Sequence, residues 1–355
     1  MRIAIDAMGG DHAPDAVLHG CIDALPLLAD DDTLVLVGQR DLIEQKLHQQ
    51  KAHDERLVIE HADDVIGMHE SPVEAVRQKP NSSIVRLCKL ASRKADVQAD
   101  AAISAGNTGA MVSAATMFMR RLPGTHRPGI ATVIPSFGGH FVLCDVGANP
   151  EPRASHLIQY AIMAETYARL ALGIERPRIA QLSIGSEAGK GTRIIREVRA
   201  ALEQAPGLNY TGYVEGRDLF EGAADVVVTD GFVGNTILKL SEGLVNGLLH
   251  SVFRFVAQYD ADLSRQLAPV AELLKKKNDY HEYGAAPLLG VNGACMICHG
   301  SSKPRAITSA IKNTRTYLRS DVNQAIVQRL KDIGPTLELS AAAARSEHQE
   351  IREPA

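Results

Sequence analysis

Short apolar runs alternate along the chain with longer segments in which apolar residues recur at helical spacing. Runs of strand length lie at residues 1–5, 33–37, 57–60, 101–103, 131–135, 141–145, 178–184, 210–214 and 226–229. Segments of helical length include residues 14–28, 40–50, 82–92 and 155–172. This alternation predicts an α/β fold with a mostly parallel sheet and right-handed crossover connections. The runs at 131–135 and 141–145 are close enough in sequence to form an antiparallel pair.

Polar, glycine-containing turns follow five of the predicted strands, at residues 6–12, 104–109, 145–150, 185–191 and 230–235. In parallel sheets, ligands bind outside the carboxyl ends of the strands. A helix that starts just after such a turn exposes free backbone N–H groups, which attract anions. The five turns are therefore predicted to converge on one crevice that binds an anion.

The turn at residues 104–109 is well suited to an anion, because it joins a buried strand to a helix of small residues. Ser104, Asn107 and Thr108 have short side chains that can cap the helix or donate to an oxyanion. An ordinary strand-to-helix turn with a glycine and a capping residue has the same composition. The segment is not a Walker A phosphate loop, so its pattern alone leaves both interpretations open.

Composition excludes several classes of protein. The 355 residues include no tryptophan and few other aromatic residues, and the formal net charge is −4. Such a chain lacks the stacking platforms and basic field of nucleic-acid binders, and we expect no nucleic-acid partner. No apolar run approaches the roughly 20 residues of a membrane span. The N-terminus meets a charge at Asp6 too early for a signal peptide, so we expect a cytoplasmic protein.

The five cysteines form no recognisable disulfide or metal pattern. Residues 295–299 spell the attachment pattern of c-type haem, but the segment is typical of an apolar strand that ends at His299. Cys144 lies in an apolar run and is interpreted as a core residue rather than a nucleophile. Since paired C-x-x-C and H-E-x-x-H motifs are missing as well, we expect neither a metal nor a cofactor.

The length of the chain fits one large α/β unit or two lobes. We predict a single catalytic unit over residues 1–340 and a flexible polar tail over 341–355. The proline- and glycine-rich passage at 122–129 is the best boundary between lobes. One lobe would then comprise 1–122 plus about 290–340, and the other about 123–290.

A projecting helical segment is predicted near residues 255–285, where apolar residues form a stripe and the chain carries Lys275, Lys276 and Lys277. One interpretation is a dimer or core face with a solvated basic end. The other is an interfacial helix whose apolar face enters a bilayer while the lysines meet anionic lipid.

Side chains at the polar turns are the candidates for chemistry. They are Asp6, Asp11, His12, Asn107, Asp145, Asn149, Lys190, Asp230, Asn235 and His299. Each alone is more often a cap or turn residue than a catalytic one. Lys190 is the strongest single candidate, because a cation between two glycines at a helix start can pair with phosphate. With no G-x-S-x-G nucleophile motif present, the pattern favours positioning of an anion over a nucleophilic side chain.

Seven motifs follow one another along nearly the whole chain. They lie at 6–14 (DAMGGDHAP), 103–109 (ISAGNTG), 145–149 (DVGAN), 214–218 (VEGRD), 230–235 (DGFVGN), 283–290 (YGAAPLLG) and 299–302 (HGSS). Together they resemble the PlsX family of phosphate acyltransferases. The resemblance implies transfer of an acyl group from an acyl carrier protein to inorganic phosphate, early in bacterial phospholipid synthesis.

The resemblance also carries expectations about structure and partners. It implies a three-layer α/β/α fold similar to phosphotransacetylases and isocitrate/isopropylmalate dehydrogenases, and a homodimer. It further implies peripheral attachment to the inner face of the cell membrane, where a downstream glycerol-3-phosphate acyltransferase is a candidate neighbour.

Roles for individual residues follow from the turns and the matched motifs together. The predicted catalytic residues are Asn107, Lys190, His12 and His299. The predicted phosphate- or acyl-donor-binding residues are Gly9, Gly10, Asp11, Ser104, Gly106, Thr108, Gly109, Asp145, Asn149, Asp230, Gly231, Asn235, Gly300, Ser301 and Ser302. Residues 104–109 are expected to hold one anion, and His12, Lys190 and residues 299–302 the other anion or the phosphopantetheine arm. Asp6, Asp145 and Asp230 are expected to orient neighbouring groups, since carboxylates repel phosphate.

Two segments depart from the family pattern. The turn at 185–191 reads Gly-Ser-Glu-Ala-Gly-Lys-Gly, where family members usually have Gly-Glu-Glu before Lys-Gly. The segment that follows Asn149 also has an unexpected spelling. In the first segment the acidic pair is broken, so Glu187 is assigned no role. The second segment is the weakest place to assign substrate contacts.

Three rival functions remain open from the sequence. A phosphotransacetylase that uses acyl-coenzyme A is the nearest, and a non-catalytic membrane-associated scaffold for lipid enzymes is the second. An NAD-dependent dehydrogenase is more distant, because the G-x-G-x-x-G motif expected after the first strand is missing.

Overall fold

The computed structural model describes residues 1–187, 189–277 and 284–350. Within them, one sheet has the strand order β3-β2-β1-β4-β11-β10-β5-β6-β9-β7-β8. The strands are β1 (Arg2–Asp6), β2 (Thr33–Gly38), β3 (Leu57–His61), β4 (Ala101–Ser104), β5 (Gly129–Ser136), β6 (Gly139–Cys144), β7 (Arg178–Leu182), β8 (Asn209–Val214), β9 (Val226–Val228), β10 (Ala286–Leu289) and β11 (Ala294–Ile297). All nine runs predicted as strands are present. The apolar strand expected to end at His299 is β11, and β10 completes the sheet.

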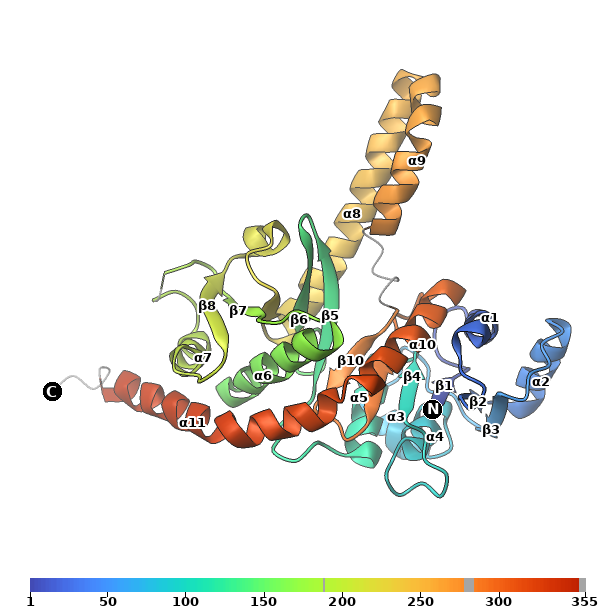
Figure 1. Ribbon diagram of the computed structural model, residues 1–355, viewed down its shortest axis with the longest axis horizontal. Coiled ribbons are helices and arrows are strands. Elements are labelled where there is room, and N and C mark those ends of the chain that lie inside the picture. Colours follow the sequence, from blue (N-terminus) through green and yellow to red (C-terminus); the bar gives the residue numbers. More distant parts are fainter. Residues whose placement is uncertain (188, 278–283, 351–355) are drawn as a thin grey trace.

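Helices cover both faces of this sheet (Figure 1). The α-helices are α1 (Asp15–Ala24), α2 (Arg40–Gln49), α3 (Pro72–Gln78), α4 (Ser83–Leu90), α5 (Thr108–Ala114), α6 (Ala154–Ala171), α7 (Arg193–Glu203), α8 (Gly231–Tyr259), α9 (Ala261–Lys277), α10 (Pro304–Arg319) and α11 (Val322–Glu350). Short helical turns are η1 (Leu25–Leu27), η2 (Ala115–Met119) and η3 (Gly216–Glu221).

Alternate side chains of each strand enter two separate cores. Ile3 and Ile5 of β1 pack into a cluster with α1, α6, α7, α10 and α11. Ala4, between them, packs into a second cluster with α3, α4 and α5. A strand that buries both faces in this way requires a helical layer on each side. The predicted three-layer α/β/α fold with a mostly parallel sheet is confirmed.

The direction of the sheet reverses in its middle. Strands β1, β2, β3, β4 and β11 run parallel, and so do β6, β7, β8 and β9. Between the two sets, β10 is antiparallel to β11 and β5, and β5 is antiparallel to β6. The predicted antiparallel pair of β5 and β6 is therefore confirmed, and it joins two parallel half-sheets of opposite direction.

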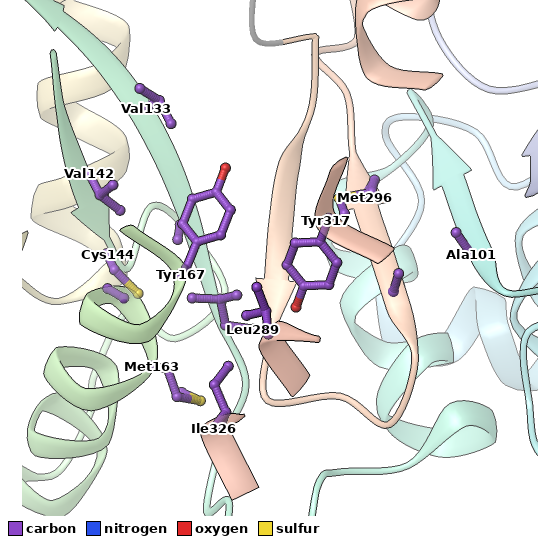
Figure 2. Close-up of a cluster of buried hydrophobic side chains, with 14 of the residues drawn as sticks. Ala101, Val133, Val142, Cys144, Met163, Tyr167, Leu289, Met296, Tyr317 and Ile326 are labelled. Atoms are coloured by element: carbon purple, nitrogen blue, oxygen red, sulfur yellow. The ribbon is translucent and has the colours of Figure 1, made fainter. Parts of the chain in front are cut away.

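Residues from both halves meet in one shared core (Figure 2). The rings of Tyr167 on α6 and Tyr317 on α10 face each other with their centroids 6.1 Å apart. Leu289 of β10 and Ile326 of α11 belong to the same buried cluster. Helix α11 packs against α6 and α7, so residues after 322 lie with the second half, whereas the sequence placed about 290–340 with the first.

Helices α8 and α9 form a long hairpin that projects from the body of the molecule (Figure 1). It lies where the sequence predicted a projecting helical segment, although its first helix starts at the sheet itself. The side chains of Lys275, Lys276 and Lys277 lie outside the described residues. Among the helices of the described ranges, none is long and apolar enough to cross a membrane.

The C-terminal segment differs from the prediction. Helix α11 continues to Glu350, so residues 341–350 are helical rather than a frayed tail, and residues 351–355 lie outside the described ranges. The physical reason is local, since residues 341–345 read Ala-Ala-Ala-Ala-Arg and alanine and arginine have high helix propensity.

Candidate active site

A cavity of about 470 Å³ opens between the turns of the two half-sheets. Its polar lining residues are Asp11, Thr108, Thr132, Asn235, Lys239, Glu242, His299 and Ser301. Its apolar lining residues include Met68, Ile130, Val146, Leu238 and Ile297. A largely apolar cavity with a few convergent polar groups is the usual form of a site for a small ligand.

Four of the five predicted turns meet at or around this cavity. Asp11, Thr108, Gly147 and Asn235 represent the turns after β1, β4, β6 and β9 among the lining residues. The half-sheets run in opposite directions, so their carboxyl ends do not share one edge. Five steps separate β4 from β9 in the sheet, and a twist of roughly 20–25° per step turns the far ends toward the near ones.

The turn after β1 is fixed by a buried carboxylate. Asp6 is 1 % exposed and accepts hydrogen bonds from Ser104 Oγ at 2.7 Å and from the backbone N–H of Met8 at 3.1 Å. Burial raises the pKa of Asp6 above its ordinary value. A Cβ atom at Gly9 would lie 2.5 Å from Asp6 Oδ2 and 2.7 Å from the nitrogen of Gly106. Glycine is therefore required where the turns after β1 and β4 touch.

Asn107 caps α5 and also holds a neighbouring loop. Its Oδ1 accepts the backbone N–H of Ala110 at 3.0 Å. Its Nδ2 donates to the carbonyl oxygens of Gly67, Met68 and Glu70 at 3.1, 3.3 and 3.2 Å. Both ends of the amide are thus engaged by the protein. Asn107 does not line the cavity, whereas Thr108 and Gly109 at the start of α5 do.

The turn after β6 is held by Asp145, which is 0 % exposed. Its carboxylate accepts the backbone N–H groups of Ile130, Ala148 and Asn149 at 2.9, 3.1 and 2.7 Å. Burial raises the pKa of Asp145 to about 6, although these hydrogen bonds favour the charged form. Asn149 donates to the carbonyl of Pro128 and the hydroxyl of Tyr160. Both residues shape the turn from within.

Helix α8 begins against the same turn. Asp230 caps it by accepting the backbone N–H of Val233 at 2.8 Å. A Cβ atom at Gly231 would lie 2.8 Å from Asp145 Oδ2. This close approach directs the first turns of α8 along the cavity, so that Asn235, Lys239 and Glu242 all line it.

His299 completes the polar wall from the loop between β11 and α10. Its Nδ1 lies 2.7 Å from Ser301 Oγ, and its Nε2 contacts Lys239 Nζ. Lys239 Nζ also lies 3.4 Å from Glu242 Oε2. The backbone carbonyl of Gly300 accepts the N–H of Asp11 at 2.8 Å, which ties this loop to the turn after β1. A cation, an imidazole and a carboxylate therefore share one side of the cavity.

Of the nineteen predicted site residues, seven line the cavity and twelve do not. Lys190, His12 and Ser302 are three of those twelve. Lys190 is exposed in the turn after β7, where its side-chain stem packs over Gly185. His12 is exposed and its carbonyl accepts the N–H of Ala16 at the start of α1. Ser302 is 4 % exposed, and its backbone N–H donates to the carbonyl of His299 at 3.0 Å. Lys190 is the clearest case, because β9 lies between β6 and β7 and carries the turn of β7 away from the cavity.

Sequence reasoning missed Lys239 and Glu242. A signal was present, because Asn235, Lys239 and Glu242 follow one another at spacings of four and three residues and so share a helix face. Cys298 also lines the cavity, but burial raises the pKa of its thiol to about 12. The thiol stays protonated near neutral pH, so the cavity has no activated cysteine nucleophile.

The fold is that of the phosphotransacetylases. A phosphotransacetylase from Streptococcus pyogenes superimposes with a TM-score of 0.57 at 18 % identity, covering 92 % of this chain and 94 % of the other. A branched-chain phosphotransacylase from Enterococcus faecalis gives 0.54 at 15 % identity, covering 90 % and 99 %. At such low identity the likeness shows the fold alone.

Sequence comparison identifies the family. The family model described as "Fatty acid synthesis protein" matches residues 1–325. A protein named phosphate acyltransferase from Trichlorobacter lovleyi is 44 % identical over 340 residues, covering 94 % of this chain and 95 % of that one. Another from Heliobacterium modesticaldum is 43 % identical over 336 residues, covering 93 % and 98 %. The chain belongs to this family, as the motifs predicted, and it is an acyltransferase.

Proposed function

We propose that the protein transfers a fatty acyl group from an acyl carrier protein to inorganic phosphate and forms acyl phosphate for glycerophospholipid synthesis. The observation that carries this proposal is one cavity in which Lys239, Asn235 and the start of α5 face a common space. The relatives of this chain are named phosphate acyltransferases, which supports phosphate as the acceptor of the acyl group. The carrier protein as donor follows from the motif resemblance.

Phosphate is assigned to the polar end of the cavity. Thr108 and Gly109 are the first residues of α5, and the first N–H groups of a helix have no intrahelical partner. Lys239 adds a cation to the same cavity, and Asn235 adds an amide. The carboxylates of Asp11 and Glu242 repel phosphate, so we assign them to orienting their neighbours, Glu242 by its approach to Lys239.

The chemistry needs no nucleophilic side chain. Inorganic phosphate is largely dianionic near neutral pH, and one of its oxygens attacks the thioester carbonyl carbon. The carbon–sulfur bond breaks, and the proton of the phosphate passes to the departing thiolate. The protein contributes orientation of the two substrates and preorganised donors for the oxyanion that develops on the carbonyl oxygen. His299 lies beside Lys239 and Ser301, where it can relay that proton.

We extend the proposal to the setting of the enzyme, a homodimer attached peripherally to the inner face of the cell membrane. The projecting hairpin supports this extension, because α8 exposes apolar side chains along one stripe that a partner surface could cover. Its exposed members include Leu240, Leu244, Leu248 and Phe255. A row of this kind suits burial against a second helix pair or a lipid surface.

The test is thiol release from a long-chain acyl carrier protein by the purified full-length chain. Release that saturates with inorganic phosphate and yields an acid-labile acyl phosphate supports the proposal. Release without phosphate would identify a thioesterase instead. Parallel assays with acyl-coenzyme A decide between the two donors. A preference for the coenzyme A thioester would identify an acyl-coenzyme A-dependent phosphotransacylase. No release from any donor would favour the scaffold.

A further inference from the structure

Two open hollows on the surface share Arg127 and carry an unusual concentration of basic side chains. One, of about 710 Å³, is lined by Arg127, Arg153 and His156. The other, of about 690 Å³, is lined by Arg120, Arg121, His126 and Arg127. Glu151 is the one carboxylate among the lining residues of both. We call Arg120, Arg121, Arg127 and Arg153 the arginine strip. His156 adds no charge to it near neutral pH, because burial and the neighbouring His126, Arg127 and Arg153 lower its pKa. The strip is locally positive, although the net charge of the whole chain is −4.

The arginines of the strip are not neutralised by the protein itself. Elsewhere in the molecule, Arg56, Arg178 and Arg329 pair with carboxylates. By contrast, Arg120, Arg127 and Arg153 are exposed and approach no carboxylate in the described part of the chain. Arg121 donates to a backbone carbonyl, that of His126. Four arginines close together with one carboxylate, Glu151, among their hollows create a local positive potential that favours an acidic partner.

The loop that carries the strip is held rigidly. Gln159 of α6 is 3 % exposed and brackets the loop, since its Oε1 accepts the N–H of His126 at 2.8 Å and its Nε2 donates to the carbonyl of Gly124 at 2.9 Å. The N–H of Leu122 donates to the carbonyl of Gly290 at 2.9 Å. A binding surface whose backbone is already ordered loses less entropy when a partner docks.

The strip also adjoins the catalytic cavity. Ala148 and Asn149 line the first hollow, while Val146 and Gly147 of the same turn line the cavity. Arg127 precedes β5 by two residues, and Ile130 of β5 lines the cavity. A partner on the strip would therefore sit one turn of chain away from the reacting groups. Met117, 44 % exposed, adds an apolar contact among the arginines, of the adaptable kind that protein partners use.

We infer that the arginine strip is the docking surface for the acidic protein that delivers the acyl thioester on a flexible arm. The inference rests on the proposed function and assigns a place to its donor. A protein fits better than a small anion, because both hollows are open and the charges extend across two of them rather than converging on one point. The arm would pass over the 146–149 turn into the cavity.

The experiment compares three acyl donors in wild type and in the variant Arg127→Glu/Arg153→Glu. The donors are the acyl carrier protein, acyl-coenzyme A and acyl-pantetheine, each with saturating phosphate. We expect kcat/KM for the carrier to fall by about tenfold or more, through encounter and affinity, while kcat/KM for acyl-pantetheine stays within twofold. The control is Lys51→Glu, a single charge reversal just after α2 and far from the strip. It should leave kcat/KM unchanged for all three donors.

The outcomes separate the two proposals. If wild type does not turn over the carrier-linked donor at all, the proposed function fails and the docking surface falls with it. If wild type turns it over and the variant does so equally well, only the docking surface is overturned. An equal loss for acyl-coenzyme A would show that the strip binds phosphate groups of small donors, which also overturns it. If the charge-reversal variant does not fold, Arg127→Gln/Arg153→Gln replaces it. We then expect a smaller fall in kcat/KM for the carrier-linked donor.

Discussion

The first turn of α8 passes so close to Asp145 that a Cβ atom on Gly234 would lie 1.9 Å from the carbonyl oxygen of Asp145. This contact joins the helix that carries Lys239 to the turn that follows β6. The position of the cavity's cation therefore depends on the absence of one side chain.

We predict that Gly234→Ala destabilises the protein by about 3 kcal/mol or more, because neither backbone segment can move without displacing the site. Thermal unfolding and phosphate-dependent activity should both decline. Gly243→Ala, in the same helix but with open space around it, is the matched control and should stabilise by about 0.5–1 kcal/mol through helix propensity. Equal melting temperatures for the two variants would contradict the close contact.

Lys239 is predicted to bind phosphate. Lys239→Met should lower kcat/KM for phosphate by about 100-fold, the usual order for removal of one preorganised electrostatic group. Lys312→Met, which removes an exposed lysine on α10, should change kcat/KM by less than twofold. Steady-state kinetics at varied phosphate, with folding checked by circular dichroism, measure both. A normal phosphate dependence in Lys239→Met would remove this residue from the site.

Asn107 is predicted to act through the 67–70 loop rather than on the substrate. Asn107→Asp retains the oxygen that caps α5 but sets a carboxylate against three carbonyl oxygens, so it should cost about 1–3 kcal/mol of stability. Limited proteolysis should show faster cleavage in that loop, and urea denaturation should show the loss. If the variant loses activity with unchanged stability and proteolysis, the amide contacts substrate directly.

Asp145 gives the fold a specific pH dependence. Its folded pKa of about 6 stands above the ordinary value of 3.8, so its contribution to stability is complete below that ordinary value and is lost as the pH rises through about 6. The difference amounts to about 3 kcal/mol. Asp145→Asn cannot titrate, so the wild type should gain more stability than the variant between pH 7 and pH 4. Parallel curves in urea denaturation across this range would exclude the raised pKa.

Much of the local structure could be read from residues in sequence order. Gly9 marks the turn after β1, and Gly231 and Gly234 mark the start of α8 after β9. The apolar runs before these glycines predict the two strands. Strand β10 was missed because it has four residues with Pro287 inside it, and proline is rare within strands. On one side β10 pairs with β11, which follows it directly in the chain, and on the other side it pairs with the distant β5.

Lys190 and Lys239 show where sequence reasoning stops. Lys190 stands between two glycines after a strand and looks like an anion ligand, whereas Lys239 looks like an ordinary charge on a helix. The sheet order places β9 between β6 and β7, which brings Lys239 beside His299 and leaves Lys190 outside the cavity lining.

The sequence by itself determined most of the elements, the polar turns and the family. Hydrophobic periodicity and glycine punctuation act over a few residues, and the family motifs are written in the chain. The tertiary structure alone decided which turns share a cavity, which cation lines it and where the arginines of separate loops gather. Strand order depends on pairings between segments far apart in the chain, and no property of one segment encodes its neighbour.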